Sequence, residues 1–184
     1  MKQTLGMMLI AILSATSAFA QQTSWSQHAT VESVQVRQDF PDPAQLAEGT
    51  IAGKVAEGML KAEIENVLRT QQAAWNRHDL DAFMSGYWNS PDLTFFSDAK
   101  ETSGWQATLD RYKAAYASPG HEMGKLEFSD LRIEMLGPEA AFVRGAWHLT
   151  MSDGKIPHGR FTLIFRKFPE GWKIIHDHTS AAKD

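Results

Sequence analysis

Two histidines two residues apart, His176 and His178, have the type and spacing that most clearly permit acid/base chemistry in this sequence. Segment 172–180 has the composition of a β-strand, and the side chains of a strand alternate between its two faces. The alternation predicts that both histidines share a face with Trp172 and Ile174, opposite Asp177. Imidazole has an unperturbed pKa of about 6.5 and exchanges protons at neutral pH. We therefore predict His176 and His178 as catalytic residues at the polar end of a pocket wall.

The same pair is compatible with a metal site, because two imidazoles on one strand face aim at a common point. The third ligand would have to be His121, His148 or His158. The sequence has no cysteine, and no paired carboxylate lies on the same predicted face, so we predict no metal and no cofactor. A serine nucleophile is set aside because no Gly-x-Ser-x-Gly elbow occurs, and glycine-rich phosphate loops are missing too.

The elements that must position these side chains follow a simple order. Apolar residues at intervals of three and four predict a long helix over residues 55–78. A short helix at 79–88, a strand at 93–97 and a helix from 103 or 104 to about 116 come next. Four strands are predicted at 123–135, 140–151, 156–167 and 172–180. Helices followed by an antiparallel meander indicate the α+β class.

The first 20 residues have the pattern of an export signal: Lys2, an apolar run over residues 5–13, and Ala18-Phe19-Ala20. The run is shorter than the roughly 20 residues that cross a bilayer as a helix. We therefore expect a periplasmic or secreted protein that starts at Gln21 and has no membrane association once the signal is removed. Residues 21–54 are predicted as a linker or N-terminal arm, and 55–182 as the folded domain.

Charge and composition exclude several functions. Without the signal the chain carries 17 basic and 22 acidic residues, a net charge of −5 with neutral histidines. The basic residues are scattered among acidic ones, so we predict no nucleic-acid partner. Disulfides and thiolate catalysis are impossible without cysteine. Six tryptophans and ten phenylalanines, one of the latter in the predicted signal, supply the packing instead.

The order of elements resembles that of the SnoaL-like domains of the nuclear transport factor 2 superfamily, over about residues 56–182. The resemblance rests on Ala-Trp-Asn-Arg-His-Asp-Leu-Asp-Ala at 74–82 and Gly-Arg-Phe-Thr-Leu-Ile-Phe-Arg-Lys at 159–167. The ending Trp-x-x-x-His-x-His-x-Ser at 172–180 is also similar to the association domain of calcium/calmodulin-dependent protein kinase II. The resemblance implies a cystatin-like roll: a cone-shaped, curved antiparallel sheet wrapped on a long N-terminal helix, with a pocket at the open end, in a homodimer.

Side chains that face such a pocket come from the long helix and from one face of the sheet. The aromatic candidates for its wall are Trp75, Tyr87, Trp88, Phe95, Trp105, Tyr112 and Trp147. Of these we predict ligand binding by Trp75, Tyr87, Phe95, Trp105 and Trp147. Arg144 and Arg160, together with Arg166, offer a clamp for a carboxylate. The alternative is that these arginines are solvated or lie in a subunit interface.

The prediction for function is the binding of a small, partly apolar organic molecule in the pocket. Two alternatives stay open, because members of the superfamily carry out unrelated tasks. One is an acid/base enzyme of the isomerase, cyclase or dehydratase type that uses His176 and His178. The other is a dimeric assembly or adaptor module. Steroid isomerisation is not supported, since the Tyr and two Asp residues that those isomerases use are not found by motif. Asp98 and Asp177 are the nearest substitutes.

Overall fold

The computed structural model describes residues 43–97 and 99–182, with side chains from residue 49 onward. Residues 41–184 belong to one compact unit. The predicted export signal at 1–20, residues 21–42 of the predicted arm, and Asp98 lie outside the described residues, so the structure does not bear on them.

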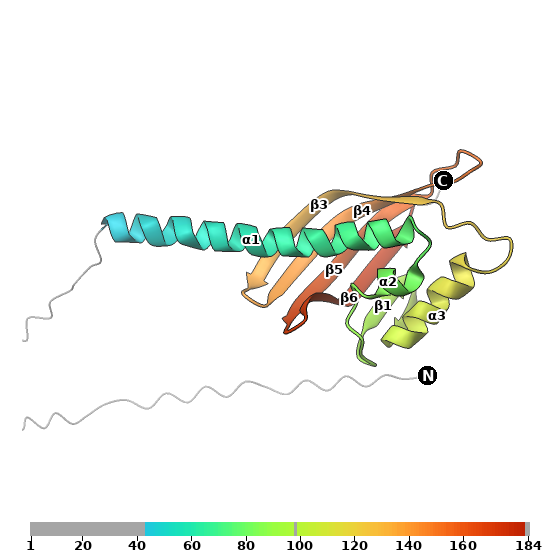
Figure 1. Ribbon diagram of the computed structural model, residues 1–184, viewed down its shortest axis with the longest axis horizontal. Coiled ribbons are helices and arrows are strands. Elements are labelled where there is room, and N and C mark those ends of the chain that lie inside the picture. Colours follow the sequence, from blue (N-terminus) through green and yellow to red (C-terminus); the bar gives the residue numbers. More distant parts are fainter. Residues whose placement is uncertain (1–42, 98, 183–184) are drawn as a thin grey trace, which may run out of the picture. The chain divides into compact units, whose positions relative to one another are not determined.

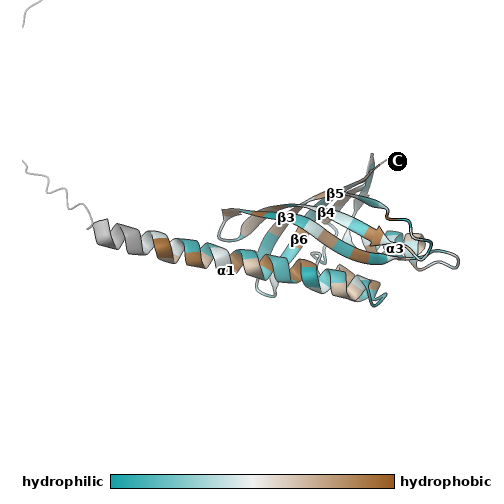
Figure 2. Cartoon of the chain, turned by 90° about the horizontal axis from the view of Figure 1, so that it is seen from above, coloured by the Kyte–Doolittle hydropathy of each residue, from teal (hydrophilic) through white to brown (hydrophobic). Residues whose placement is uncertain are grey.

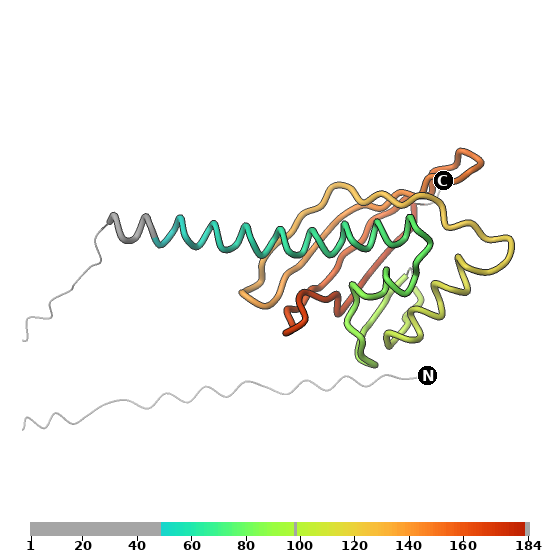
Figure 3. Tube along the Cα trace, viewed as in Figure 1, coloured from blue at the N-terminus to red at the C-terminus, as the bar shows by residue number. Residues whose placement is uncertain are grey.

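The long helix, α1, spans Pro43–Trp75 and begins twelve residues before the predicted start at residue 55. Its C-terminal half packs on the domain, where Ile64 and Leu68 are almost fully buried. Its N-terminal half extends beyond the sheet (Figures 1 and 3). The prediction that the apolar, buried side of the helix continues through this half was wrong, because Val55 and Met59 are 58% and 63% exposed. At 3.6 residues per turn they lie on roughly the opposite side of the helix from Ile64 and Leu68.

Short elements follow at the C-terminal end of α1. Asp79 caps the N-terminus of α2, Leu80–Met84, by accepting a hydrogen bond from the Ala82 amide at 2.9 Å. The structure ends this helix earlier than predicted. A hairpin of β1, Thr94–Ser97, and β2, Lys100–Ser103, comes next, and only its first strand was predicted. Helix α3 spans Trp105–Tyr116.

The rest of the described chain is the predicted meander of four strands: β3 at Lys125–Gly137, β4 at Ala140–Thr150, β5 at His158–Phe168 and β6 at Gly171–Ala181. The strand order is β2-β1-β6-β5-β4-β3. Strands β3 to β6 pair antiparallel, whereas β1 pairs parallel to β6, so the sheet is mixed. The sheet is curved and open, and α1 crosses one face of it, here called the inner face (Figure 1). The predicted α+β class is confirmed.

One irregularity changes which side chains of β6 face inward. Phe165 on β5 pairs with Ile174, but its neighbour Ile164 pairs with His176, so Ile175 is an extra residue in β6. Such a β-bulge reverses the alternation of side chains beyond it. Trp172 and Ile174 face inward before the bulge, and Asp177 faces inward after it. The prediction that both histidines share a face with Trp172 and Ile174 was therefore wrong.

The core lies between α1 and the inner face of the sheet. Phe161, Leu163 and Phe165 of β5 are buried there, and Figure 2 shows the hydrophobic residues of the strands and of α1. A Cβ atom at Gly145 would lie 2.3 Å from the Phe161 ring, so this glycine lets the ring pack against β4. None of the helices described here is long and apolar enough to cross a membrane.

Candidate functional site

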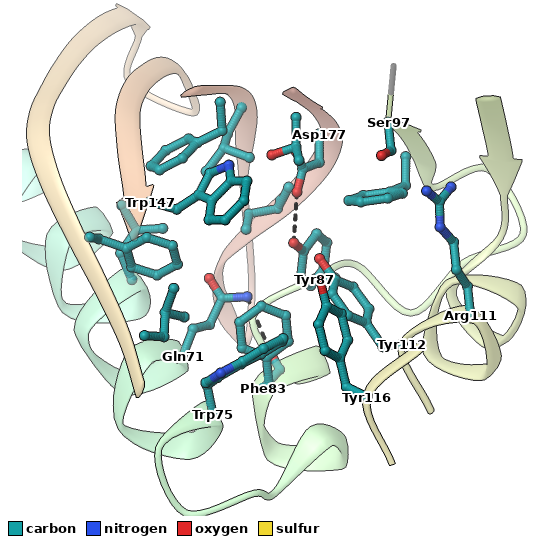
Figure 4. A pocket seen from close by; sticks show the side chains of 18 of the residues that line it. Gln71, Trp75, Phe83, Tyr87, Ser97, Arg111, Tyr112, Tyr116, Trp147 and Asp177 are labelled. Atoms are coloured by element: carbon teal, nitrogen blue, oxygen red, sulfur yellow. Dashed lines mark hydrogen bonds between the residues drawn. The ribbon is translucent and has the colours of Figure 1, made fainter. Parts of the chain in front are cut away.

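A cavity of about 180 Å³ lies between the inner face of the sheet, α1 and α3. Most of its wall is aromatic, as Figure 4 shows. The aromatic lining residues are Trp75, Phe83, Tyr87, Phe95, Tyr112, Tyr116, Phe128, Trp147 and Phe161. Packing between elements holds several of them in place: Trp75 of α1 meets Tyr112 and Tyr116 of α3 edge to face, with ring centroids 6.0 and 4.8 Å apart. Such an aromatic wall suits an apolar ligand.

One carboxyl group, that of Asp177 on β6, is buried in this wall. Asp177 is 4% exposed, and its Oδ2 accepts a hydrogen bond from the Tyr87 hydroxyl at 2.7 Å. Its Oδ1 is buried without a hydrogen-bond partner among the described residues. Burial raises the pKa of Asp177 to about 7, while Tyr87, Thr179 and Arg111 partly oppose that rise. The carboxyl group is therefore divided between its neutral and ionised forms near neutral pH.

Two tyrosine hydroxyls surround this carboxyl group. Burial, first of all, raises the pKa of Tyr87 and of Tyr112, and the negative charge of Asp177 raises both further. Both phenols are therefore neutral at physiological pH, and each has a single O–H donor, which Tyr87 already gives to Asp177. Tyr87 follows α2 and Tyr112 lies on α3, so two separate elements supply them (Figure 4).

Four further polar side chains line the cavity: Gln71, Ser97, Arg111 and Thr179. Gln71 of α1 is 2% exposed, and its Nε2 donates to the Phe83 carbonyl at 3.0 Å. Arg111 of α3 is half-buried. Its guanidinium lies 4.9 Å from the centroid of the Phe95 ring, and Nη1 donates to the Thr102 hydroxyl at 3.1 Å. Gln71, Arg111 and Asp177 were not among the predicted site residues.

The structure brings some of the predicted ligand-binding residues together and leaves others outside. Trp75, Tyr87, Phe95 and Trp147 line the cavity, as does Tyr112. Trp105 does not, because its indole donates to the Met84 carbonyl at 2.9 Å between α3 and α2. Trp88 stacks on Phe168 instead, at 5.5 Å.

The predicted arginine clamp does not face the cavity either. Arg144 and Arg160 are exposed, and each pairs with an acidic residue of β3: Arg144 with Glu134 at 3.5 Å and Arg160 with Asp130 at 2.9 Å. The alternation along β4 and β5 explains this placement, since their neighbours Val143 and Phe161 point inward. Arg144 and Arg160 are therefore solvated, which is one of the alternatives that the sequence left open.

The two predicted catalytic histidines lie on the other side of the sheet, here called the outer face. His176 Nδ1 is 2.6 Å from the Thr94 hydroxyl, and both imidazoles contact the Phe96 ring edge to face. Burial and the nearby His178 lower the pKa of His176. Neither histidine lines the cavity. Any chemistry by this pair would have to act at the outer face.

The other candidate ligands for a metal do not gather around this pair. His148 and His158 stack on each other across β4 and β5, with ring centroids 6.0 Å apart. Within residues 43–97 and 99–182, no group of three His, Asp or Glu side chains is placed to hold a metal ion.

Comparisons with known proteins place the chain in a family. A family model for the SnoaL-like domain matches residues 64–184. A comparison with curated proteins gives no significant match. Among solved structures, an NTF-2 like protein of unknown function from Shewanella oneidensis is 40% identical, with a TM-score of 0.61 over 65% of this chain and 98% of that chain.

Two more distant structures share the fold alone. A protein of unknown function with a cystatin-like fold, from Nostoc punctiforme, is 12% identical, with a TM-score of 0.58 over 67% of this chain and 92% of that one. A proposed calcium/calmodulin dependent protein kinase II association domain from Xanthomonas campestris is 18% identical, with a TM-score of 0.52 over 66% and 87%. Together with the sheet, the helix and the cavity, these matches show that the chain belongs to the SnoaL-like domains of the nuclear transport factor 2 superfamily.

Proposed function

We propose that the domain binds a small, largely apolar organic molecule that carries a hydroxyl or carbonyl group, in the cavity around Asp177. The observation that carries the proposal is the buried, unpartnered Oδ1 of Asp177 in an aromatic wall. A buried acceptor without a partner costs about 1–3 kcal/mol. A ligand hydroxyl that donates to Oδ1 would remove this cost once the side chains that cover the atom move aside, and the rings around it would bind the apolar part of the ligand.

The size of the cavity restricts the ligand. An apolar cavity of about 150 Å³ holds benzene, whereas drug-sized ligands occupy roughly 300–1,000 Å³. A cavity of about 180 Å³ therefore suits a single ring or a short branched chain.

Acid/base catalysis is the second candidate, and the environment of Asp177 favours it. A general acid or base works best when its pKa is close to the working pH, and burial raises that of Asp177 to about 7. The hydroxyl of Tyr112 would stabilise negative charge on a carbonyl oxygen as it develops, while Tyr87 holds Asp177 in place through its own hydrogen bond. The reaction class is the one considered for the histidines, but the proton passes through a carboxyl group inside the cavity.

The test is a thermal-shift and calorimetric screen with neutral single-ring alcohols and aldehydes, on the wild type, Asp177→Asn and Glu127→Gln. Glu127 is an exposed carboxylate of β3 and serves as the matched control. We expect ligands that bind the wild type and the control alike and bind Asp177→Asn more weakly. Each variant is compared with its own unliganded form, because binding is read from the added stability. Equal binding by all three proteins would contradict the role of Asp177.

Export and dimerisation are part of the proposal. Residues 1–20 support export, and N-terminal sequencing of the protein from a periplasmic fraction should begin at Gln21. The outer face of the sheet, with the half-buried Phe96, Phe142 and Ile164, supports a dimer. Light scattering coupled to size-exclusion chromatography tests it, with a dimer mass as the expected result.

A further inference from the structure

Arg111 brings a positive charge to the wall of the cavity, where no carboxylate of the described residues forms an ion pair with it, although its charge lowers the pKa of Asp177. The residue lies in the middle of α3 and lines the cavity next to Phe95 and Tyr112. Its one hydrogen bond to the described residues goes to the Thr102 hydroxyl. A guanidinium offers a fork of N–H donors, so most of them remain available to a ligand.

Three other arginines form ion pairs, whereas Arg166, like Arg111, lies over an aromatic ring without an ion pair to the described residues. Arg69 pairs with Glu65 on α1, and Arg144 and Arg160 pair with residues of β3. Arg111 forms no such pair within residues 43–97 and 99–182. Asp177 and Arg111 are the two side chains of the lining that can carry a full charge at neutral pH, and they do not form an ion pair with each other.

We infer that the ligand of the cavity is a carboxylate with a single ring, whose carboxylate binds the Arg111 guanidinium while the ring lies against the aromatic wall. The inference rests on the proposed function and names its ligand class. Figure 4 shows Arg111 at the edge of the group of lining side chains, with the rings on one side of it. A planar guanidinium and a carboxylate form two parallel hydrogen bonds, which matches one anionic group at one end of an apolar body.

The geometry favours a carboxylate over a phosphate. One guanidinium balances one negative charge, and the cavity lining offers no second cation. The lining beyond Arg111 is apolar except for Gln71, Ser97, Asp177, Thr179 and the tyrosine hydroxyls. A dianion would meet Asp177 without further compensation, whereas a monoanion is balanced by Arg111 and leaves Asp177 in contact with the ring substituent.

The test is isothermal titration calorimetry with benzoate and phenylacetate, each against a neutral analogue of the same shape, benzamide and phenylacetamide. The proteins are the wild type, Arg111→Gln, Arg111→Lys and Arg166→Gln. Arg166 is the matched control, because it is exposed and lies over Phe168, away from the cavity. Circular dichroism and thermal unfolding show that each variant is folded.

We expect the wild type and Arg166→Gln to bind the carboxylates at least about tenfold more tightly than the amides, as a charge-assisted hydrogen bond predicts. Arg111→Gln should lose that preference and keep its affinity for the amides. Arg111→Lys should show a preference for carboxylates that is weaker than that of the wild type and stronger than that of Arg111→Gln. Lysine keeps the charge but not the two parallel hydrogen bonds.

Three results would overturn the inference. Equal affinity of the wild type for acids and amides shows that Arg111 does not select an anion, and leaves the proposed function intact. An equal loss of both ligands in Arg111→Gln assigns the residue a structural role through Phe95 and Thr102. Failure of every acid, amide, alcohol and aldehyde to bind the wild type overturns both this inference and the proposed function.

Discussion

Replacing Asp177 by Asn should make the protein more stable at alkaline pH, although Asp177 is the polar centre of the cavity. Burial raises the pKa of this carboxyl group from its ordinary value of 3.8 to about 7. Between these two values the folded state binds more protons than the unfolded state, so the free energy of unfolding falls as the pH rises. A difference of about three pKa units, at about 1.4 kcal/mol each, amounts to about 4 kcal/mol.

Asparagine has the shape of the neutral carboxyl group, accepts the Tyr87 hydrogen bond and does not titrate. The free energy of unfolding of Asp177→Asn should therefore equal that of the wild type below about pH 4 and exceed it by about 4 kcal/mol at pH 8. For a domain of this size the gain corresponds to a melting temperature roughly 10 °C higher. Urea unfolding followed by tryptophan fluorescence at several pH values measures the difference directly.

The pH profile separates this explanation from a general effect of the substitution. Glu127→Gln, the exposed control, should show no gain that grows between pH 4 and pH 8. A difference between Asp177→Asn and the wild type that is the same at both pH values would refute the reasoning, and so would a loss of stability at pH 8.

Further substitutions test other parts of the structure. Tyr87→Phe removes the hydrogen bond to Asp177, so unfolding at pH 8 should cost about 1.5–3 kcal/mol less; urea unfolding at pH 4 should show a smaller loss, and equal losses would contradict it. The double variant His176→Ala/His178→Ala should leave the affinity for cavity ligands unchanged in calorimetry, since both side chains lie on the outer face; a loss in a folded variant would give the histidines a role in the cavity. Gly159→Ala should unfold at a much lower temperature, because its Cβ would lie 1.9 Å from the Ser180 carbonyl oxygen. The control Gly53→Ala lies in open space on α1, and its free energy of unfolding should rise by up to about 1 kcal/mol. Equal effects of the two substitutions in thermal unfolding would refute the packing at Gly159.

Hydrophobic periodicity was sufficient to predict most of the fold. The strands β3 to β6 and the helix α3 appear close to their expected bounds, because alternation and turn residues are local signals. The sequence did not reveal β2, whose residues 100–103 are polar and pair only with β1. The early start of α1 was also missed, since the side chains of residues 49–59 are exposed and give periodicity no buried face to detect.

The site was harder to predict for one physical reason. The assignment of strand side chains to alternate faces assumes regular pairing. The extra residue Ile175 reverses the order of faces between Ile174 and His176. Nothing in the local sequence marks that bulge, so the histidines were assigned to the pocket and Asp177 to the other face. The aromatic wall needed less information, because Trp75 is the last residue of α1 and Tyr87 closely follows α2, both next to the core. Arg111 was missed because its approach to Phe95 depends on how α3 packs on β1.

The measurement that tests the central claim most directly is a two-dimensional NMR titration of the wild type with benzyl alcohol, a neutral single-ring probe, in which the side-chain signals of lining and outer-face residues are followed together. If the cavity binds the ring, the signals of Trp75, Tyr112 and Trp147 shift and saturate together, while those of His176 and His178 stay in place. Shifts confined to the histidines, or no saturable shift at any residue, would contradict the claim that this cavity is a ligand-binding site.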